Sequence, residues 1–583
     1  MSLQPVRYAV DLSDRVHHLL RVTVHVPADA ARQVRMALAN WTPGSYFLRN
    51  YVHHVQWLRA TGGDGAPVDI ERDGANAWLM TNTGHGLTVE LELYANELTV
   101  RTNHVDDHHA LIIPAATFPF VTGLESRQHE VTIDAYPQSH RVWSLLPPGQ
   151  EPGTFVADDL YHLIDSAFEV GELDSVTFTV DEMPHEFVWA GHAPTPDLTL
   201  IADNATAIAG RASEVFGGDL PVDRYTVLCT AWDRGGGGLE HRDGAVIQVP
   251  VTTFGDPDQT RRFYRLFAHE YFHLWNVKRL VPRELLAPDL ERTTHSPSLW
   301  VAEGWTAYYD GLLPARAGVT DASWLLTQFG DVLDRVASTP GAQLQSLRQA
   351  SHDAWTKFYV RDENSSNASA DYYGQGAMVA WELDLRLRAD YGVERGLDDV
   401  IASLWQHFGQ SGVGYTETDI LEAIASHADD KLAALIDERV GTPSLPMITD
   451  ELLAAIGLRY VGEDQHQVPD LGVEMVEDDD GVVFSSALRQ GPAWEAGITG
   501  GDRLVAINAT TVRRGELAKL LQAYQPGAVV ELTVTRGPRI ITAAVRLGEP
   551  RLRRRIVAVD NPTATQHTAF ARWCGGSLDQ LPR

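Results

Sequence analysis

The sequence predicts a multidomain α+β protein whose first part is rich in strands and whose middle part is mainly helical. Its 583 residues exceed what a single hydrophobic core accommodates, so several domains are expected. Apolar and polar residues alternate up to about residue 180, which is the periodicity of half-buried strands. Helical periodicity then dominates up to about residue 455. We expect domains at 1–180, 181–460 and 466–548, followed by a C-terminal tail at 549–583.

The first part should be an antiparallel β domain, either a sandwich or a saddle. The segments LRVTVHV and LTVELELYANELTVRT alternate with period two, as half-buried strands do. Turn-forming segments such as TGGDGAP and LPPGQEPG separate the strands. The middle part opens with a short β portion that includes YTVLCTAW and GGLEH, and helices follow it.

The run FGDPDQTRRFYRLFAHEYFHLW is expected to form one helix with an HExxH motif. Asp256 suits the N-cap and Pro257 suits the first turn. His269 and His273 are four residues apart, so they project from one face and could ligate one zinc ion. Glu270 lies beside them and could take a proton from a water at the metal. The alternative is a buried helix that carries two hydrogen-bonded histidines.

The residues after the motif exclude one class of zinc peptidase. A metzincin has glycine three residues after the second histidine and a further histidine three residues beyond it. Asn276 and Arg279 occupy these positions, so a third ligand from a later segment is expected. A carboxylate would complete the two-histidine, one-glutamate set that leaves a position open to water. The carboxylate candidates are Glu284, Glu291 and Glu303, with His295 as a weaker rival.

Glu303 is the strongest of these candidates. It lies in SLWVAEGWTAYYDGLL, an aromatic-rich segment that is expected to form a second buried helix. A carboxylate among Trp300, Trp305 and Tyr308 would be unfavourable without a partner, and a zinc ion is such a partner.

LWVAEGWTAYYDGLL resembles the third-ligand helix of gluzincin aminopeptidases, which have a thermolysin-like catalytic domain. The separation of 30 positions from His273 to Glu303 (303 − 273) matches the glycyl-aminopeptidase family whose members carry a C-terminal PDZ domain. Three further segments are similar to that family: NWTPGSYFLRNYVHHV, GGGGLEHRD and DYYGQGAMVAWELDLRLR. The resemblance covers nearly the whole chain in the same order.

The resemblance implies a role for each motif residue. One zinc ion per chain, held by His269, His273 and Glu303, would polarise a water and the scissile carbonyl. Glu270 would be the general base and would pass its proton to the leaving amine. Tyr373, in the segment YGQG, would stabilise the oxyanion. Tyr372 is the fallback, although packing in the core is the preferred interpretation of that residue.

The segment GGLEH carries the exopeptidase hypothesis. In relatives of aminopeptidase N, a GxMEN-like strand offers its backbone to the substrate and its glutamate to the free amino group. Here Glu240 is retained, while Leu239 and His241 replace the methionine and the asparagine. Gly237 and Gly238 would allow the substrate backbone to approach closely. The alternative is that these glycines only form a tight turn.

The third part resembles a PDZ domain. GPAWEAGITGGD is the recognisable piece, and LGVEMV falls where the peptide-carboxylate loop of such domains lies. Leu471, Gly472 and Val473 are therefore the candidate peptide loop. The domain could bind the C-terminus of a protein or a peptide substrate as an added strand. Alternatively, it is a structural module only.

Composition narrows the possible partners and location. The net charge of −31 argues against nucleic acid or an anionic membrane as the main partner. Cys229 and Cys574 are the only cysteines, which excludes a disulfide framework or a cysteine zinc site. No signal-peptide core or long apolar run is found, so a cytoplasmic location is expected. The preference for arginine over lysine suggests a bacterial source.

The sequence thus predicts a zinc aminopeptidase that acts on peptides with a free N-terminus, with glycine and alanine favoured there. The preference for small residues rests on the resemblance alone. A zinc endopeptidase that recruits its substrates through the PDZ domain is the main alternative. A non-catalytic PDZ adaptor is a lesser one, because such a protein would be expected to have lost Glu270 or a ligand.

Overall fold

The structure is a computed structural model that describes residues 4–151, 153–191, 195–233, 235–462, 468–551 and 553–583. The chain divides into two compact units. The first contains Met1–Thr294 and Ile401–Thr416, and the second contains His295–Val400 and Glu417–Arg583. Among the described residues, none of the helices combines the length and apolar character that a membrane span requires.

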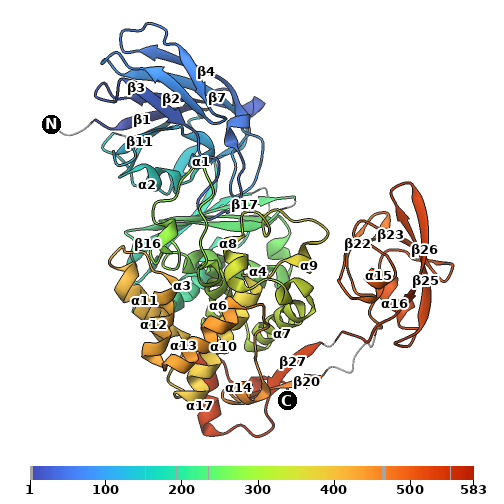
Figure 1. The fold of residues 1–583 in the computed structure, drawn as a ribbon. Coiled ribbons are helices and arrows are strands. Elements are labelled where there is room, and N and C mark those ends of the chain that lie inside the picture. Colours follow the sequence, from blue (N-terminus) through green and yellow to red (C-terminus); the bar gives the residue numbers. More distant parts are fainter. Residues whose placement is uncertain (1–3, 152, 192–194, 234, 463–467, 552) are drawn as a thin grey trace. The chain divides into compact units, whose positions relative to one another are not determined.

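The N-terminal part of the first unit is built from strands, as predicted (Figure 1). Its largest sheet has the order β13-β11-β1-β2-β7-β4. These strands are Thr154–Ala157, His129–Asp134, Val6–Asp11, Leu19–Val26, Leu87–Tyr94 and Val55–Gly62. The pairing is antiparallel except between β1 and β11, which are parallel. A parallel pair requires a crossover connection rather than a hairpin, and the long stretch of chain between β1 and β11 provides one.

Two four-stranded sheets complete this part. The first has the order β10-β3-β6-β5, and its strands are Phe120–Val121, Gln33–Ala37, Ala77–Thr81 and Ile70–Asp73. The second has the order β12-β14-β9-β8, and its strands are Arg141–Ser144, Phe168–Gly171, His109–Ile112 and His104–Val105. The alternating apolar residues of all three sheets form one continuous core.

A five-stranded sheet follows in the order β15-β16-β17-β19-β18. Its strands are Asp174–Val180, Met183–Ala190, Tyr225–Trp232, Gly244–Pro250 and Gly237–His241. The GGLEH segment is therefore β18, the terminal strand of the sheet, where one side of its backbone is not paired with another strand. The helices α3, Leu198–Val215, and α4, Pro257–Phe272, belong to the same unit.

Helix α4 begins as the sequence predicts. The Asp256 side chain accepts hydrogen bonds from the backbone N–H groups of Asp258 and Gln259, and Pro257 occupies the first turn. Phe263 and Phe267 are buried on its apolar face. The helix ends at Phe272, so His273 lies at its C-cap with helical backbone angles.

The second unit is helical up to about residue 455 and differs from the prediction at one important point. The aromatic segment around Glu303 is not one helix but two, α5, Leu299–Ala302, and α6, Gly304–Arg316. They meet at Glu303, whose φ and ψ are −103° and −41°. Gly304 packs against Gly376 of α10, Gly374–Asp390, so closely that a side chain would overlap its backbone. The continuous apolar pattern gave no sign of this break. The remaining long helices are α7, Ala322–Ser338, α12, Glu417–His427, α13, Asp430–Gly441, and α17, Ala564–Cys574.

The PDZ-like part has its own small core and a sheet with the order β21-β22-β23-β25-β26. These strands are Val473–Asp478, Gly481–Ala487, Arg503–Ile507, Val529–Arg536 and Arg539–Arg546. Strands β20, Leu458–Gly462, and β27, Arg554–Ala558, pair antiparallel on either side of this part in the sequence (Figure 1). The expected start of the domain, residue 466, lies outside the described residues.

The C-terminal segment is more structured than the expected tail. Beyond β27 it forms α17, whose Trp573 is fully buried. The Trp573 indole N–H donates to the hydroxyl of Tyr308 on α6 at 2.9 Å, and Arg316 donates to the Trp573 carbonyl. The aromatic residues of α17 therefore anchor the end of the chain on the helical core. From the sequence we expected only a tail here, because the segment contains the charged run RLRRR, which is typical of a solvated surface.

Candidate active site

The HExxH histidines lie at the C-terminal end of α4. The rings of His269 and His273 are 4.7 Å apart between centroids and nearly perpendicular. The His273 Nδ1 lies 2.8 Å from the carbonyl oxygen of Asn276, which can only accept a hydrogen bond. Nδ1 therefore carries the proton, and Nε2 presents a lone pair. A backbone carbonyl that fixes the tautomer in this way is usual for metal-ligating histidines.

Glu270 is buried against the edge strand of the sheet. Its exposed fraction is 4%, and its carboxylate lies against the backbone of Gly238 in β18. A Cβ at Gly238 would overlap that carboxylate, so only glycine permits this approach. The edge strand and the candidate base are therefore in direct contact.

Glu240 follows on the same strand and is also buried, with an exposed fraction of 4%. Gly44, from the NWTPGSYF segment, lies so close that a Cβ there would be 2.5 Å from Glu240 Oε1. The φ of Gly44 is +93°, which also favours glycine. Among the described residues, Glu240 Oε1 has no hydrogen-bond partner. The strand thus holds a buried carboxylate oxygen that is ready to accept a donor.

Lys278 is a residue of this site that sequence reasoning missed. Its ammonium lies 2.9 Å from Asp165 Oδ1 and 4.0 Å from Glu240 Oε1. Burial lowers the pKa of Lys278, but the charges of Asp165 and Glu240 outweigh it, and the pKa lies above its ordinary value. Lys278 therefore stays charged. The signal in the sequence was a lysine, rare in this chain, five residues after the second histidine of the motif.

A tight turn brings Lys278 into this position. Val277 has a φ of +91°, which is a strained conformation for a β-branched residue. Its backbone N–H donates to the carbonyl of Leu280 at 3.0 Å and closes the turn directly after the zinc-motif helix.

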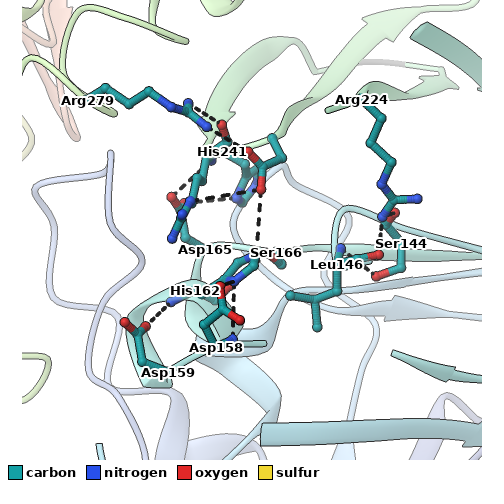
Figure 2. A network of polar contacts seen from close by, with 12 residues as sticks. Ser144, Leu146, Asp158, Asp159, His162, Asp165, Ser166, Arg224, His241 and Arg279 are labelled. Atoms are coloured by element: carbon teal, nitrogen blue, oxygen red, sulfur yellow. Dashed lines mark hydrogen bonds and ion pairs between the residues drawn. The ribbon is translucent and has the colours of Figure 1, made fainter. Parts of the chain in front are cut away.

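Asp165, the partner of Lys278, also belongs to a wider polar network. Figure 2 shows Asp165 in this network together with His241 and Arg279. The Asp165 carboxylate lies 3.2 Å from His241 Nδ1 and accepts the backbone N–H of Arg242 at 3.0 Å. Burial alone would raise the pKa of Asp165. The contacts with Lys278 and His241 have the larger effect, so the pKa lies below its ordinary value. A neighbouring ion pair joins Arg279 to Asp243 at 2.8 Å. The charged groups at the end of β18 are thus held in place by several contacts each.

A cavity of about 390 Å³ opens beside these groups. Trp41, Gly44 and Tyr46 line it from the N-terminal part, and Glu240 and Lys278 line it from the sheet and the turn. The NWTPGSYF segment therefore contributes directly to the cavity in which Glu240 lies.

In the second unit, Glu303 has an exposed fraction of 1%. Tyr373 is the N-cap residue of α10, and its hydroxyl lies 3.1 Å from that of Tyr359. Burial raises the pKa of Tyr373 well above its ordinary value, and the charge of Glu303 raises it further. Tyr373 is therefore a protonated hydroxyl at neutral pH. Tyr372 is fully buried and packs on Phe358, as expected for a core residue.

The rival ligands have other environments. Glu291 accepts two hydrogen bonds from the guanidinium of Arg35, at 2.7 and 2.8 Å, and one from Asn76. His295 places its Nδ1 2.6 Å from the carbonyl of His352 and stacks on that ring. Glu284 is exposed on a short 3₁₀ turn.

Three groups of side chains in the described part of the chain could hold a metal ion. In each group, one ligand atom from every member lies within 4.8 Å of the others. The groups are His269, His273 and Glu303; Glu240, Glu270 and His273; and His104, Asp106 and His109. The first group contains the three residues that we predicted from the sequence as zinc ligands. Two imidazoles and one carboxylate are a ligand set that suits zinc.

Comparisons with known proteins agree with this fold. The sequence profile of M61 glycyl aminopeptidases matches residues 262–379, that of the peptidase M61 N-terminal domain matches 7–172, and that of PDZ domains matches 469–547. The curated proteins contain no match to this chain.

Solved structures add the whole-chain comparison. An aminopeptidase N family protein from Idiomarina loihiensis superposes with a TM-score of 0.91 and 26% identity, over 98% of this chain and 100% of its own. An M1 zinc metallopeptidase from Deinococcus radiodurans aligns over 76% of this chain and 95% of its own, with a TM-score of 0.46 and 14% identity.

The HExxH helix, the edge strand beside it and the matched profiles define a metallo-aminopeptidase. The chain is similar to M61 glycyl aminopeptidases over residues 262–379 and to the N-terminal domain of that family over residues 7–172, and residues 469–547 match a PDZ domain. The resemblance found in the sequence is thereby confirmed.

Proposed function

We propose that this enzyme uses one zinc ion to remove single residues from peptides with a free N-terminus, and that glycine and alanine are favoured there. The observation that carries the exopeptidase part is Glu240. Its Oε1 is buried and without a hydrogen-bond partner among the described residues, and Glu240 groups with Glu270 and His273 within 4.8 Å. A substrate ammonium would supply the missing donor as a charge-assisted hydrogen bond. The small-residue preference rests on the family.

Lys278 does not supply the missing donor to Glu240. Its ammonium pairs with Asp165 at 2.9 Å and lies farther from Glu240 Oε1, at 4.0 Å. Two carboxylates, those of Asp165 and Glu240, lie within 4.0 Å of this one ammonium, and such an arrangement favours a further cation. A peptide that continued past this point would instead leave Glu240 Oε1 buried without a hydrogen-bond donor.

We propose His269, His273 and Glu303 as the residues that hold the zinc. In support, the three side chains offer ligand atoms within 4.8 Å of one another, and the contact of His273 Nδ1 with the Asn276 carbonyl is of the kind that orients metal-ligating histidines. Zinc bound there would supply Lewis-acid polarisation of a water and of the scissile carbonyl.

The chain's own residues would then carry the protons and the developing charge. Glu270 would take a proton from the attacking water and deliver it to the leaving amine. Its position against Gly238 of the edge strand supports this role, because the substrate backbone would lie along the same strand. Tyr373 would donate its hydroxyl proton in a hydrogen bond to the carbonyl oxygen as negative charge builds there.

Replacing Tyr373 tests the oxyanion role. We expect Tyr373→Phe to lower kcat by about 10²- to 10³-fold with little change in KM, because the hydrogen bond strengthens only in the transition state. Steady-state kinetics on a glycyl peptide measures both values. Tyr372→Phe is the matched control and should retain most activity. An inactive Tyr372→Phe beside a nearly wild-type Tyr373→Phe would assign the role to Tyr372.

Blocking the substrate amine tests the role of Glu240. We expect acetylation of the N-terminus to reduce kcat/KM severely for the wild type, because the amide cannot act as a cation toward Glu240. In Glu240→Ala the penalty for acetylation should be much smaller, while activity on free peptides falls. The measurement is kcat/KM for paired free and acetylated peptides with each enzyme.

Glu284→Ala, at an exposed position, is the control for this comparison. Equal cleavage of acetylated peptides or of internal bonds by the wild type would contradict the aminopeptidase proposal. It would favour a zinc endopeptidase that recruits substrates through its PDZ domain.

For the PDZ domain we propose that Leu471, Gly472 and Val473 form the loop that receives a peptide C-terminus. In support, this loop leads into β21, the terminal strand of its sheet, and strand addition requires such an edge. Gly472 has a φ of +68°, which suits a tight loop before a strand. A cytoplasmic location and a bacterial source stay predictions from the sequence.

A further inference from the structure

We propose that the β8–β9 hairpin of the N-terminal domain binds a second divalent transition-metal ion, such as zinc, through His104, Asp106 and His109. This site is separate from the HExxH histidines and shares no residue with them. It occupies six consecutive residues, so its ligands are brought together by one hairpin rather than by distant parts of the chain.

The distances between the ligand atoms suit a metal. One atom from each of the three side chains lies within 4.8 Å of the others. His104 Nε2 lies 3.1 Å from Asp106 Oδ2, and a metal that binds between them would displace the proton of this hydrogen bond. Around a tetrahedral zinc with bonds of about 2.0–2.1 Å, ligand atoms lie about 3.3 Å apart. Small side-chain movements would therefore complete the coordination, with a fourth position left for water.

Asp106 is held in the orientation that a ligand needs. Its Oδ1 accepts the backbone N–H groups of His108 and His109, both at 2.8 Å. These two bonds turn Oδ2 toward His104. Ligating carboxylates are typically fixed in this way by hydrogen bonds to their other oxygen.

His109 provides the strongest indication. Its Nδ1 lies 2.8 Å from Glu169 Oε1, and both side chains are 1% exposed. Because an ionised carboxylate only accepts, Nδ1 carries the proton, and in the neutral imidazole that binds a metal Nε2 holds a lone pair. Nε2 is buried and has no hydrogen-bond partner among the described residues. A carboxylate behind a histidine that presents its other nitrogen is the outer arrangement of many zinc sites.

A metal-free polar network explains these contacts less well. It would leave His109 Nε2 buried without a partner in the described structure, which is unfavourable. A bound cation would satisfy the lone pair of His109 and neutralise part of the charge of Asp106. Metal can also reach the hairpin, because His104 lines a cavity of about 410 Å³ together with Trp232 and Gly235.

The test uses the full chain with the motif histidines removed, as His269→Asn/His273→Asn, so that a metal at the HExxH site does not contribute. After chelation and dialysis, Co²⁺ titration should show one bound equivalent with visible d–d absorption. Adding His104→Asn/His109→Asn should abolish this signal. Adding His25→Asn/His53→Asn, at two exposed histidines of the same domain, should leave it unchanged.

A conservative variant covers the case in which the double variant does not fold. Glu169→Gln should weaken Co²⁺ and Zn²⁺ binding by about 10- to 100-fold, as expected for loss of an outer carboxylate. Far-UV circular dichroism without metal checks that each variant is folded. No Co²⁺ equivalent in the background variant, or unchanged affinity in Glu169→Gln, would overturn the proposal. Neither result depends on whether the enzyme is an aminopeptidase.

Discussion

Glu270→Gln should abolish nearly all turnover while the protein keeps its full complement of zinc. Glutamine has almost the same shape as glutamate, so the close contact with Gly238 is preserved. Glutamine cannot accept a proton at neutral pH, which removes both proton transfers assigned to Glu270. We expect kcat to fall by at least about 10³-fold, near the upper range for loss of a general base.

Two measurements on the same preparation separate a base from a ligand. Zinc content by elemental analysis should equal that of the wild type, and kcat on a glycyl peptide should be near the detection limit. Glu284→Gln, at an exposed position between the motif and Glu303, is the control and should retain activity. A marked loss of zinc in Glu270→Gln would make Glu270 a ligand rather than the base. Substantial residual turnover with full zinc would assign the base role to another carboxylate, and Glu240 is the nearest candidate.

The elements that carry the motif were predictable because their signals are local. Asp256, Pro257 and the apolar spacing of α4 lie within one stretch of sequence, and each acts on its immediate neighbours. The edge strand could be found for the same reason, since its glycines and Glu240 lie within one short segment, GGLEH. Helix and strand signals of this kind do not depend on the rest of the fold.

Features that depend on distant contacts were not predictable from such patterns. The break at Glu303 accompanies the close packing of Gly304 against Gly376, which are far apart in sequence. Gly44 was part of a recognised segment, but nothing local indicated that its backbone touches Glu240. The partnership of Lys278 with Asp165 likewise joins residues more than a hundred positions apart.

The hairpin site shows the opposite case. The spacing of His104, Asp106 and His109 is visible in the sequence. It was not recognised as a metal site because the whole region was interpreted as strands of a β domain. Only the burial of His109 Nε2 and its contact with Glu169, which lies on another strand, distinguish it from an ordinary histidine-rich turn.

Glu303→Ala should remove most of the catalytic zinc and with it the activity. Glu303 supplies the only carboxylate in the proposed ligand set, and loss of a direct ligand should weaken zinc by more than the roughly 10- to 100-fold typical of an outer partner. The protein should stay folded without metal, because the site lies on a large core rather than holding a small domain together. Zinc titration against a competing chelator measures the affinity, and thermal unfolding of the metal-free proteins measures the stability.

The control for this experiment is Glu291→Ala, which removes the rival carboxylate nearest to Glu303 in sequence. Glu291 is held by Arg35 in the N-terminal part, so its loss should leave zinc affinity and kcat close to wild type. Metal-free Glu303→Ala should still show a cooperative thermal unfolding transition, as the metal-free wild type does, because the large core does not depend on the metal. If the hairpin binds its own metal, Glu303→Ala should retain that second equivalent, and His104→Asn/His109→Asn should retain the first. Unchanged zinc affinity at the HExxH histidines in Glu303→Ala would contradict the ligand assignment and leave Glu240 as the carboxylate to test next.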